Sequence, residues 1–478
     1  MSAYETIIGL EIHVQLLTET KIFCACRNQF EAETSTNTCP VCLGMPGSLP
    51  VLNKKAVELA CRFILAVGGD INTTSVFARK NYFYPDLPKG YQISQHELPL
   101  GKSGTIRVET DDGTSGVKLQ GIHLEEDAGK SFHLEDSSNI DFNRCGTPLL
   151  EIVTMPVIKS AHEAYLFLNR IRQIVQYLEI SSGDMEKGAL RCDANVSVRP
   201  EGQHEYGIRT EVKNLNSIRY VEKALSYEVN RQINLLEQGG FVVQETRLWD
   251  ENNNRTVTMR TKEESPDYRY FPEPDLPPMK LDNEWLEEIR DAIPELPHQK
   301  IDRFVREYSI PQYDAAVLTS TVNLADYFEQ TAKLCKNPKQ VSNWIMTEVM
   351  KTMKDEKSDP EDLKVSPKNL AGLINNIENG TISGKIAKEI FAEMAFTGKE
   401  SDEIIAARGL QQITDKKVIE QAIKQVLSEN PANLKRYFDG QEKLFGYFVG
   451  QVMKKTEGKA SPHLVNQILK DKLDGRKA

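Results

Sequence analysis

Three consecutive carboxylates, Glu125, Glu126 and Asp127, end a run in which apolar and polar residues alternate, and Gly129 then favours a turn. Adjacent carboxylates repel one another unless a cation joins them. Oxygen ligands at a turn suit Mg²⁺, which also keeps positions free for phosphate oxygens. The stretch therefore predicts a magnesium site, and the alternative is a solvated acidic turn.

Other predicted strands carry similar polar faces. In Ile7–Leu16, Glu11 and His13 alternate with apolar residues and so share one face, where both could reach a single cation or phosphate. In Gly188–Arg199 the same alternation puts Asp193 beside Arg191 and Asn195. The alternative for each strand is a solvent-exposed face.

Two close cysteine pairs, Cys24 with Cys26 and Cys39 with Cys42, are separated by a short polar loop. This arrangement favours a four-thiolate structural Zn²⁺ site, because the metal would tie off a loop with too few apolar residues to pack by itself. The first pair has one intervening residue where two are usual. A redox pair or free thiols remain the alternatives.

The segment 79–92 is aromatic, broken by proline and carries three cations, Arg79, Lys80 and Lys89. A loop of this composition could stack a base and hold phosphates, or it could be a packed loop with solvated charges. A phosphate loop requires a glycine five residues before the glycine of Gly-Lys-Ser. The two Gly-Lys-Ser sequences of this chain have His96 and Leu124 at that position, so no phosphate loop is expected. Neither Gly-x-Ser-x-Gly nor Gly-x-Gly-x-x-Gly occurs, so hydrolase and dinucleotide-binding functions lack their usual motifs.

The order of predicted elements indicates an α+β protein in three parts. A strand-rich cradle domain is expected over residues 1–293, with helices at 52–68, 161–178 and 218–236 and a strand at 249–260. Everything beyond Pro278 is expected to be helical, including one helix over 338–354. An all-helical domain follows at 294–400, a hinge lies near 397–401, and a small helical tail domain, 401–478, carries an apolar stripe and a Lys/Arg cluster that faces a phosphate backbone or solvent.

Composition indicates a globular protein of two to four domains, with 478 residues, 40% hydrophobic and 27% charged residues. No secretory signal and no run of about 18 apolar residues is visible, so a cytoplasmic protein with reduced thiols and no membrane contact is expected. The net charge of −10 argues against nonspecific nucleic-acid binding. The tail nevertheless has 14 Lys and Arg against 10 Asp and Glu, which suggests that a polyanion meets that end.

The motifs taken together resemble the B subunits of the aspartyl/glutamyl-tRNA(Asn/Gln) amidotransferase family. The resemblance covers essentially the whole chain and rests on long strings in order, at 9–13, 79–86, 123–130, 141–151, 191–195, 213–217, 267–275, 450–453 and 464–467.

This resemblance implies a ligase that uses ATP and Mg²⁺ to convert the side-chain carboxylate of Glu on tRNA(Gln), or of Asp on tRNA(Asn), into an acyl phosphate. Ammonia from a separate amidase subunit then displaces the phosphate, a small third subunit completes a heterotrimer, and the helical and tail domains hold the misacylated tRNA. Glu11, His13 and Glu125 are then expected to bind Mg²⁺, with Glu126 and Asp193 as further catalytic residues, and Arg79, Lys80 and Lys89 to contact ATP phosphates. A phosphoryl group that is transferred requires such neutralisation by metal and cations.

Two other functions remain open. The chain could be a zinc-stapled adaptor that positions tRNA while a partner does the chemistry, but an adaptor has no use for converging carboxylates and histidines. It could also be a stand-alone ligase that uses free ammonia, but no feature of the sequence supplies a nitrogen donor.

Overall fold

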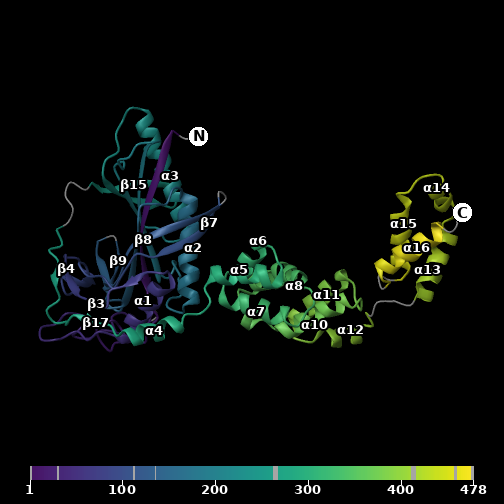
Figure 1. Cartoon of the computed structure of the whole chain (residues 1–478), viewed down its shortest axis with the longest axis horizontal. Coiled ribbons are helices and arrows are strands. Elements are labelled where there is room, and N and C mark those ends of the chain that lie inside the picture. The colour runs from purple at the N-terminus through teal and green to yellow at the C-terminus, as the bar shows by residue number, and fades with distance from the viewer. Residues whose placement is uncertain are drawn as a thin grey trace. The chain divides into compact units, whose positions relative to one another are not determined.

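The computed structural model describes residues 3–29, 32–110, 113–134, 136–261, 267–410, 416–456 and 460–474. The chain divides into a first unit, Met1–His298, and a second unit, Gln299–Ala478 (Figure 1). All the strands that are described lie in the first unit, whereas the described elements of the second unit are helical. The α+β class predicted from the sequence is confirmed.

A ten-stranded sheet dominates the first unit, and its neighbours follow the order β15-β14-β13-β12-β1-β11-β8-β6-β2, with β7 paired to β8. All of the pairs are antiparallel except β13 with β14. The strands are β1 (Tyr4–Gln15), β2 (Asp70–Ile71), β6 (Gly101–Lys102), β7 (Thr105–Thr110), β8 (Gly113–Glu126), β11 (Pro148–Thr154), β12 (Leu190–Pro200), β13 (Thr210–Lys213), β14 (Glu245–Asp250) and β15 (Arg255–Thr261).

One face of this sheet is the core of the unit. Even-numbered residues of the central strands, such as Leu10, Ile152 and Leu124, are buried together with apolar side chains of three helices, including Phe63 and Phe167. These helices are α1 (Lys54–Ala66), α2 (Ala161–Tyr177) and α3 (Ile218–Glu237), and α4 (Asn283–Asp291) adds Leu286 to the same core. Because side chains alternate along a strand, the odd-numbered residues lie on the opposite face.

Smaller sheets accompany the main sheet. A three-stranded sheet has the order β16-β4-β5, and two-stranded pairs join β9 with β10 and β3 with β17. Gln95 fixes the three-stranded sheet to the main one, because its side-chain oxygen accepts a hydrogen bond from the Leu124 amide at 3.0 Å. The strands are β3 (Thr74–Ser75), β4 (Phe77–Asn81), β5 (Tyr91–Gln95), β9 (Lys130–His133), β10 (Ser138–Asp141), β16 (Phe271–Pro272) and β17 (Met279–Lys280).

Two sequence expectations in this unit are wrong. The single strand expected over 249–260 is a hairpin of β14 and β15, because Asp250 accepts a hydrogen bond from the Asn253 amide and Asn254 adopts a left-handed conformation (φ 48°). The region after Pro278 is not wholly helical, since β17 pairs with β3.

The second unit contains two separate apolar cores. The first core joins Phe304, Phe328 and Leu370 and extends to Ile404 and Ile405. Its helices are α5 (Pro297–Tyr308), α6 (Gln312–Leu318), α7 (Val322–Ala332), α8 (Pro338–Trp344), α9 (Met350–Glu356), α10 (Pro367–Glu378), α11 (Gly384–Thr397) and α12 (Ser401–Arg408). The helix expected over 338–354 contains a π-helical turn, Ile345–Val349, between α8 and α9.

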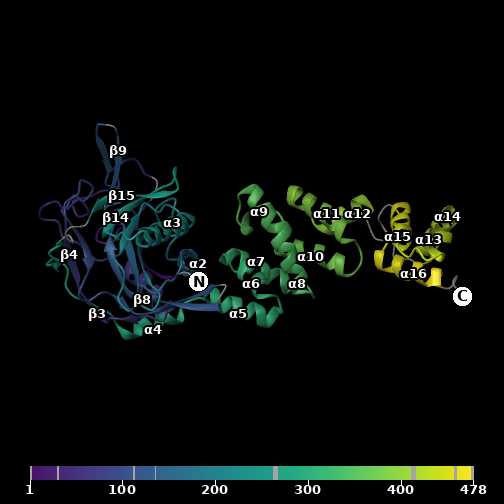
Figure 2. The ribbon, with the colours of Figure 1, turned by 90° about the horizontal axis from the view of Figure 1, so that it is seen from above.

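The tail has a core of its own, formed by residues that include Ile419, Phe448 and Leu469. Its helices are α13 (Lys416–Glu429), α14 (Pro431–Phe438), α15 (Leu444–Lys455) and α16 (Pro462–Asp474) (Figure 2). The hinge expected near 397–401 precedes α12, but α12 packs into the helical core, because Ile404 and Ile405 are buried there. The apolar core of the helical domain therefore includes α12, and the separate core of the tail begins after it. Among the described residues, no helix has the length and apolarity needed to cross a membrane.

The position of β1 against β11 depends on a buried side chain. The register of β11 against β8 shifts at Val153/Thr154, and the Thr154 hydroxyl accepts a hydrogen bond from the Leu10 amide of β1 at 2.9 Å. We expect Thr154→Val to lower the free energy of unfolding of the first unit by about 1–3 kcal/mol, because a buried amide loses its acceptor. Thr154→Ser, which keeps the hydroxyl, is the matched control.

The measurement is urea denaturation followed by tryptophan fluorescence in a Trp344→Phe background, where the remaining tryptophans, Trp249 and Trp285, both report on the first unit. Equal midpoints for the valine and serine variants would contradict the assignment.

Candidate active site and metal centres

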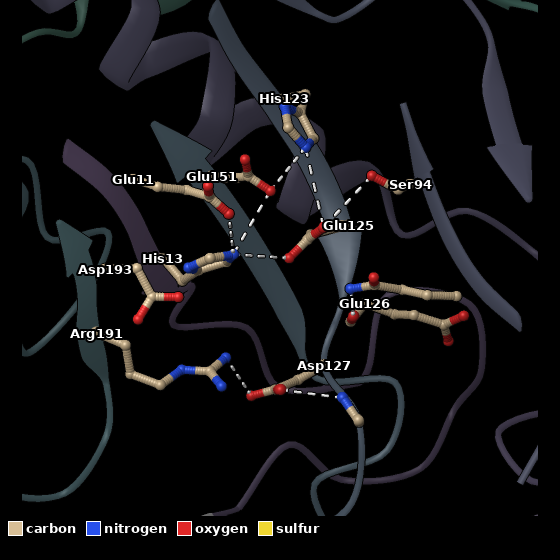
Figure 3. Close-up of polar contacts among 12 residues, drawn as sticks. Glu11, His13, Ser94, His123, Glu125, Glu126, Asp127, Glu151, Arg191 and Asp193 are labelled. Atoms are coloured by element: carbon tan, nitrogen blue, oxygen red, sulfur yellow. Dashed lines mark hydrogen bonds and ion pairs between the residues drawn. The ribbon is translucent and has the colours of Figure 1, made fainter. Parts of the chain in front are cut away.

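Four adjacent strands place polar side chains in one row on the odd-numbered face of the main sheet. In the antiparallel register, His13 of β1 lies opposite Arg191 of β12 on one side and Glu151 of β11 on the other. Glu151 in turn lies opposite His123 of β8. The row Arg191–His13–Glu151–His123 therefore crosses four strands that are far apart in the sequence (Figure 3).

Neighbouring rows complete a compact cluster. His13 Nε2 lies 3.4 Å from Glu125 Oε1, 3.5 Å from Glu151 Oε2 and 3.9 Å from Glu11 Oε1. His123 Nε2 lies 3.1 Å from Glu151 Oε2 and 3.9 Å from Glu125 Oε2. We call these five residues, Glu11, His13, His123, Glu125 and Glu151, the central cluster.

The charges of the central cluster perturb one another. Burial lowers the pKa of the His13 imidazole, but its bond to Glu151 and the charge of Glu125 outweigh this effect and raise the pKa to about 9. Burial and the neighbouring Glu151 raise the pKa of Glu125, whereas the two imidazoles hold the pKa of Glu151 well below its usual range despite burial. The carboxylates of the central cluster thus favour positive charge in the space between them, where a cation would bind.

The three consecutive carboxylates do not share one cation. They are buried rather than solvated, with exposed fractions of 2%, 2% and 4% for Glu125, Glu126 and Asp127. Glu125 belongs to the central cluster, whereas Glu126 points to the other side of the strand and pairs with Lys89. Asp127 lies 2.9 Å from Arg191 NH2 and 3.5 Å from Arg144 Nε. Strand alternation and the turn that follows it separate the three side chains.

The remaining predicted residues occupy different positions. Asp193 lies beside Glu11 on the neighbouring strand and forms an ion pair with Lys213 at 2.5 Å. Lys89 contacts Glu126 and not the central cluster. Arg79 is held by Glu273, to which its Nε and NH2 donate at 2.7 and 2.8 Å, so its guanidinium is committed to a structural pair.

Lys80 is the predicted cation that the structure brings to the central cluster. Its ammonium lies 5.0 Å from the centre of the Tyr268 ring. Burial lowers the pKa of Lys80, but the charges of Glu125 and Glu151 more than compensate, and the net shift is upward. Lys80 therefore stays charged beside these carboxylates, on β4 of the smaller sheet. On the adjacent strand β5, the Ser94 hydroxyl donates to Glu125 Oε2 at 3.3 Å.

Sequence reasoning missed two members of the central cluster, Glu151 and His123. His123 alternates with Glu125 on one strand, so the shared face was available as a signal. Glu151 interrupts the apolar strand Pro148–Thr154, and a lone acid in such a strand is itself a signal, since burying an unpaired carboxylate is costly.

The central cluster fits a divalent cation. Ligand atoms of Glu11, His13 and Glu151 lie within 4.8 Å of one another, and so do those of His123, Glu125 and Glu151. Carboxylate oxygens suit Mg²⁺, and the imidazoles extend the set toward Mn²⁺ or Zn²⁺. The sequence predicts Glu11, His13 and Glu125 as ligands. His13 lies near a carboxylate oxygen of each of the other two, but Glu11 and Glu125 fall in different ligand sets, and Glu151 is common to both sets.

The four cysteines predicted to bind Zn²⁺ also converge. The sulfur atoms of Cys24, Cys26, Cys39 and Cys42 lie within 4.8 Å of one another, and those of Cys39 and Cys42 are 3.9 Å apart. Tetrahedral Zn–S bonds of about 2.3 Å place sulfurs roughly 3.8 Å apart, so the set fits a structural zinc.

A buried cation accompanies these thiols. Lys21 is fully buried, and its Nζ lies 3.7 Å from Cys42 Sγ and donates to the Asn37 carbonyl at 2.6 Å. A hydrogen bond from Cys24, together with the Lys21 charge, lowers the pKa of the Cys42 thiol to about 5. The loop thus favours a thiolate at Cys42, the form that binds a metal.

The chain thus combines a strand-rich domain, which bears a carboxylate–imidazole cluster, with helical domains. Residues 6–287 match the family described as "GatB/GatE catalytic domain", and residues 326–473 match "GatB domain". The chain therefore belongs to the family of B subunits of aspartyl/glutamyl-tRNA(Asn/Gln) amidotransferases.

Similar relatives are named as the B subunit of the aspartyl/glutamyl-tRNA(Asn/Gln) amidotransferase. The protein of Thermodesulfovibrio yellowstonii is 53% identical over 98% of both chains. That of Caldicellulosiruptor bescii is 52% identical over 98% of this chain and 99% of its own. That of Chlorobium phaeobacteroides is 52% identical over 99% of this chain and 100% of its own.

Because Glu151 contacts both imidazoles of the central cluster, we expect Glu151→Gln to weaken Mg²⁺ or Mn²⁺ binding by on the order of 10–100-fold. Glu126→Gln is the control, since its side chain lies on the other face of β8. Metal titration by calorimetry, or by the EPR signal of Mn²⁺, compares them. Equal affinities in the two variants would exclude Glu151 as a ligand.

We expect about one zinc per chain, held by the four thiolates, and its loss in Cys39→Ser, because a tetrahedral site with one ligand removed binds metal far more weakly. Cys335→Ser, which changes a cysteine of the second unit, is the control. Native mass spectrometry and elemental analysis measure the metal content. Wild-type protein that binds no zinc would refute the site.

Proposed function

We propose that the chain is the ATP-dependent, amide-forming subunit of a glutamine-dependent tRNA amidotransferase. It converts Glu on tRNA(Gln), Asp on tRNA(Asn), or both, into Gln or Asn. The observation that carries this proposal is the central cluster, which gathers three carboxylates and two imidazoles from β1, β8 and β11 beside the charged Lys80.

The reaction explains why such a site is needed. A carboxylate is a poor acyl donor because its leaving group would be oxide, and transfer of the γ-phosphoryl group of ATP supplies a better one. The charge on the transferring phosphoryl group must then be neutralised. A divalent cation in the central cluster would contribute that neutralisation and orient the phosphate oxygens.

The residues of the chain then have distinct tasks. Glu11, His13, Glu125 and Glu151 hold the cation, and His123 fixes Glu151 from the other side. Lys80 contacts the phosphates of ATP, because it is the cation nearest these carboxylates among the three predicted ones. Asp193 and its partner Lys213 keep the neighbouring row of the sheet polar next to Glu11.

Arg191 and Arg144 supply a second positive region beside the central cluster. Both contact Asp127, and the pKa of Arg191 is raised because the charge of Asp127 outweighs the effect of burial. Guanidinium groups that already sit at a buried turn can bind phosphate oxygens with little loss of side-chain entropy. We assign Lys89 and Glu126 to the support of this turn, and Arg79 with Glu273 to the support of the smaller sheet.

The nitrogen donor comes from a partner. We infer that an amidase subunit supplies ammonia and that a small third subunit completes the heterotrimer, and the lack of a hydrolase elbow in the sequence is compatible with this division of work. These reactions take place in the cytoplasm, where aminoacyl-tRNA is made. The names of the relatives, which describe one subunit of an amidotransferase acting on tRNA, support this assembly.

The helical and tail domains hold the tRNA in this proposal. The predicted Lys/Arg cluster of the tail consists of Lys454, Lys455, Lys459, Lys470 and Lys472. Lys455 and Lys472 form ion pairs with Glu429 and Glu420. Lys454 and Lys470 are exposed and face solvent, where a phosphate backbone could meet them. Lys459 lies outside the described residues.

We expect Glu125→Gln to lower the rate of ATP-dependent amidation by on the order of 100-fold or more, because a buried ligand of the cation is lost, while tRNA affinity stays unchanged. The test reconstitutes the chain with its amidase and third-subunit partners, ATP, glutamine and each misacylated tRNA, and analyses the amino acid released from the tRNA. Wild-type turnover by the variant would refute the catalytic role.

The same assay distinguishes a catalytic subunit from an adaptor that only positions tRNA. If Glu125→Gln and wild type amidate equally while removal of the chain abolishes the reaction, the chain positions tRNA and does no chemistry.

We expect a chain that ends at Leu410 to bind tRNA more weakly than the full chain, without a change in glutamine hydrolysis by the partner. The tail has its own apolar core, so this deletion removes a complete packing unit and leaves the helical core intact. Filter binding at several salt concentrations measures the affinity. If the truncated chain bound tRNA as tightly as the full chain, the tail would be excluded from tRNA binding.

A further inference from the structure

A cavity of about 660 Å³ adjoins the central cluster. Glu11 is common to both, since its carboxylate belongs to the cluster and the residue is part of the cavity wall. The remaining wall comes from the same face of the sheet, including Gly9 of β1 and Asn195 and Ser197 of β12, and from the loop that joins β12 to β13. Figure 3 shows Glu11 and Glu126 at opposite sides of the group of residues drawn, so the cavity borders the side away from Glu126.

Two glycines create this space. Gly9 occupies an odd position of β1, where any other residue would project a side chain toward the cavity, and a Cβ there would meet Pro156 at 3.7 Å. Gly207 holds the covering loop against β12, because a Cβ at that position would lie 2.1 Å from the Val198 carbonyl oxygen. The cavity is thus a built feature of the fold, and its volume lies within the usual range of ligand sites.

The charges of the lining distinguish this cavity from the opposite side of the cluster. Among the described lining residues, Glu11 is the one acid and Arg209 the one cation, and the other polar groups are neutral amides and hydroxyls. Arg191 and Arg144 lie instead toward Asp127, and Lys80, whose charge also reaches Glu11, lies near Glu125 and Glu151. A triphosphate, which carries several adjacent negative charges, suits the second environment and not the first.

We propose that this cavity is the acceptor subsite, which binds the aminoacylated terminal nucleoside of the tRNA and presents its side-chain carboxylate to the central cluster. This inference rests on the proposed function. A terminal aminoacyl nucleoside has a neutral base and ribose, one adjoining phosphate and one α-ammonium group. Arg209 complements the phosphate, the side-chain oxygen of Gln244 the ammonium, and Asn195 and Ser197 the hydroxyl and base groups. ATP would then reach the central cluster from the side of Lys80.

The test narrows the cavity without touching the cluster. Gly9→Val places a branched side chain in the space, in a strand that favours such residues. Gly121→Val is the matched control, because Gly121 lies in β8 of the same sheet, does not line the cavity, and its Cβ would meet nothing within 4 Å. Arg209→Gln is a second variant at an exposed position, where folding is not at risk.

In the reconstituted enzyme, we expect Gly9→Val and Arg209→Gln to raise KM for glutamylated or aspartylated tRNA by on the order of tenfold or more, with KM for ATP unchanged. Mg²⁺ affinity stays at the wild-type value in both variants, which shows that the sheet is intact. For the control Gly121→Val, we expect the KM values for tRNA and for ATP to equal those of the wild type.

Three results would overturn the proposal. A rise of KM for ATP would assign the cavity to the nucleotide. Unchanged KM values for both tRNA and ATP would show that neither substrate occupies the cavity. A defect that appears with glutamine and vanishes when ammonium chloride supplies the nitrogen would make the cavity a route for ammonia. If wild-type enzyme itself fails to amidate, the proposed function fails, and that outcome is distinct from these three.

Discussion

The antiparallel register of β12, β1, β11 and β8 is the constraint on which the site depends. This register sets Arg191, His13, Glu151 and His123 side by side, although they come from four separate parts of the sequence. A slip of one residue would turn each strand over, sending its charges into the core and its apolar residues to the other face. The apolar core beneath, filled by α1, α2 and α3, therefore fixes the geometry of the polar cluster above it.

The buried charges of the site are arranged so that each one has a partner. Glu151 is ionised between two imidazoles, Asp127 between two guanidinium groups, and Glu126 faces Lys89. A buried carboxylate without such a partner would destabilise the fold by several kcal/mol. The pairing allows three adjacent acids to be buried within a few ångströms, and it leaves Glu125 and Glu11, whose pKa values are raised, as the members that gain most from an added cation.

Alternation along single strands allows much of this site to be predicted from the sequence. It places Glu11 with His13, and Asp193 with Arg191, on common faces, and the cysteine spacing identifies the four thiols. It cannot show which strands are neighbours, so Glu151 remains one acid in an apolar strand. It puts Glu125 and Glu126 on opposite faces of β8, but it cannot show which cations lie on each side, such as Lys89 beside Glu126.

The limits of prediction in the fold have the same origin. The hairpin of β14 and β15 resembles one strand in the sequence because its turn residues continue the polar pattern, and only the hydrogen bonds of Asp250 reveal the reversal. The sequence places the end of the helical domain before α12 because Gly398 and its polar neighbours resemble a linker. Burial of Ile404 and Ile405, a property of tertiary packing, assigns that helix to the domain before it.

Glu151 also bears on how the newly made chain avoids association with other chains. Its strand, Pro148–Thr154, is otherwise uncharged and rich in branched apolar residues, a composition typical of segments that form intermolecular β-structure. A single acid within such a segment opposes stacking of identical strands, because like charges would lie directly above one another. The residue to which we assign the role of cation ligand in the folded protein is thus also of the kind that opposes aggregation before the sheet has closed.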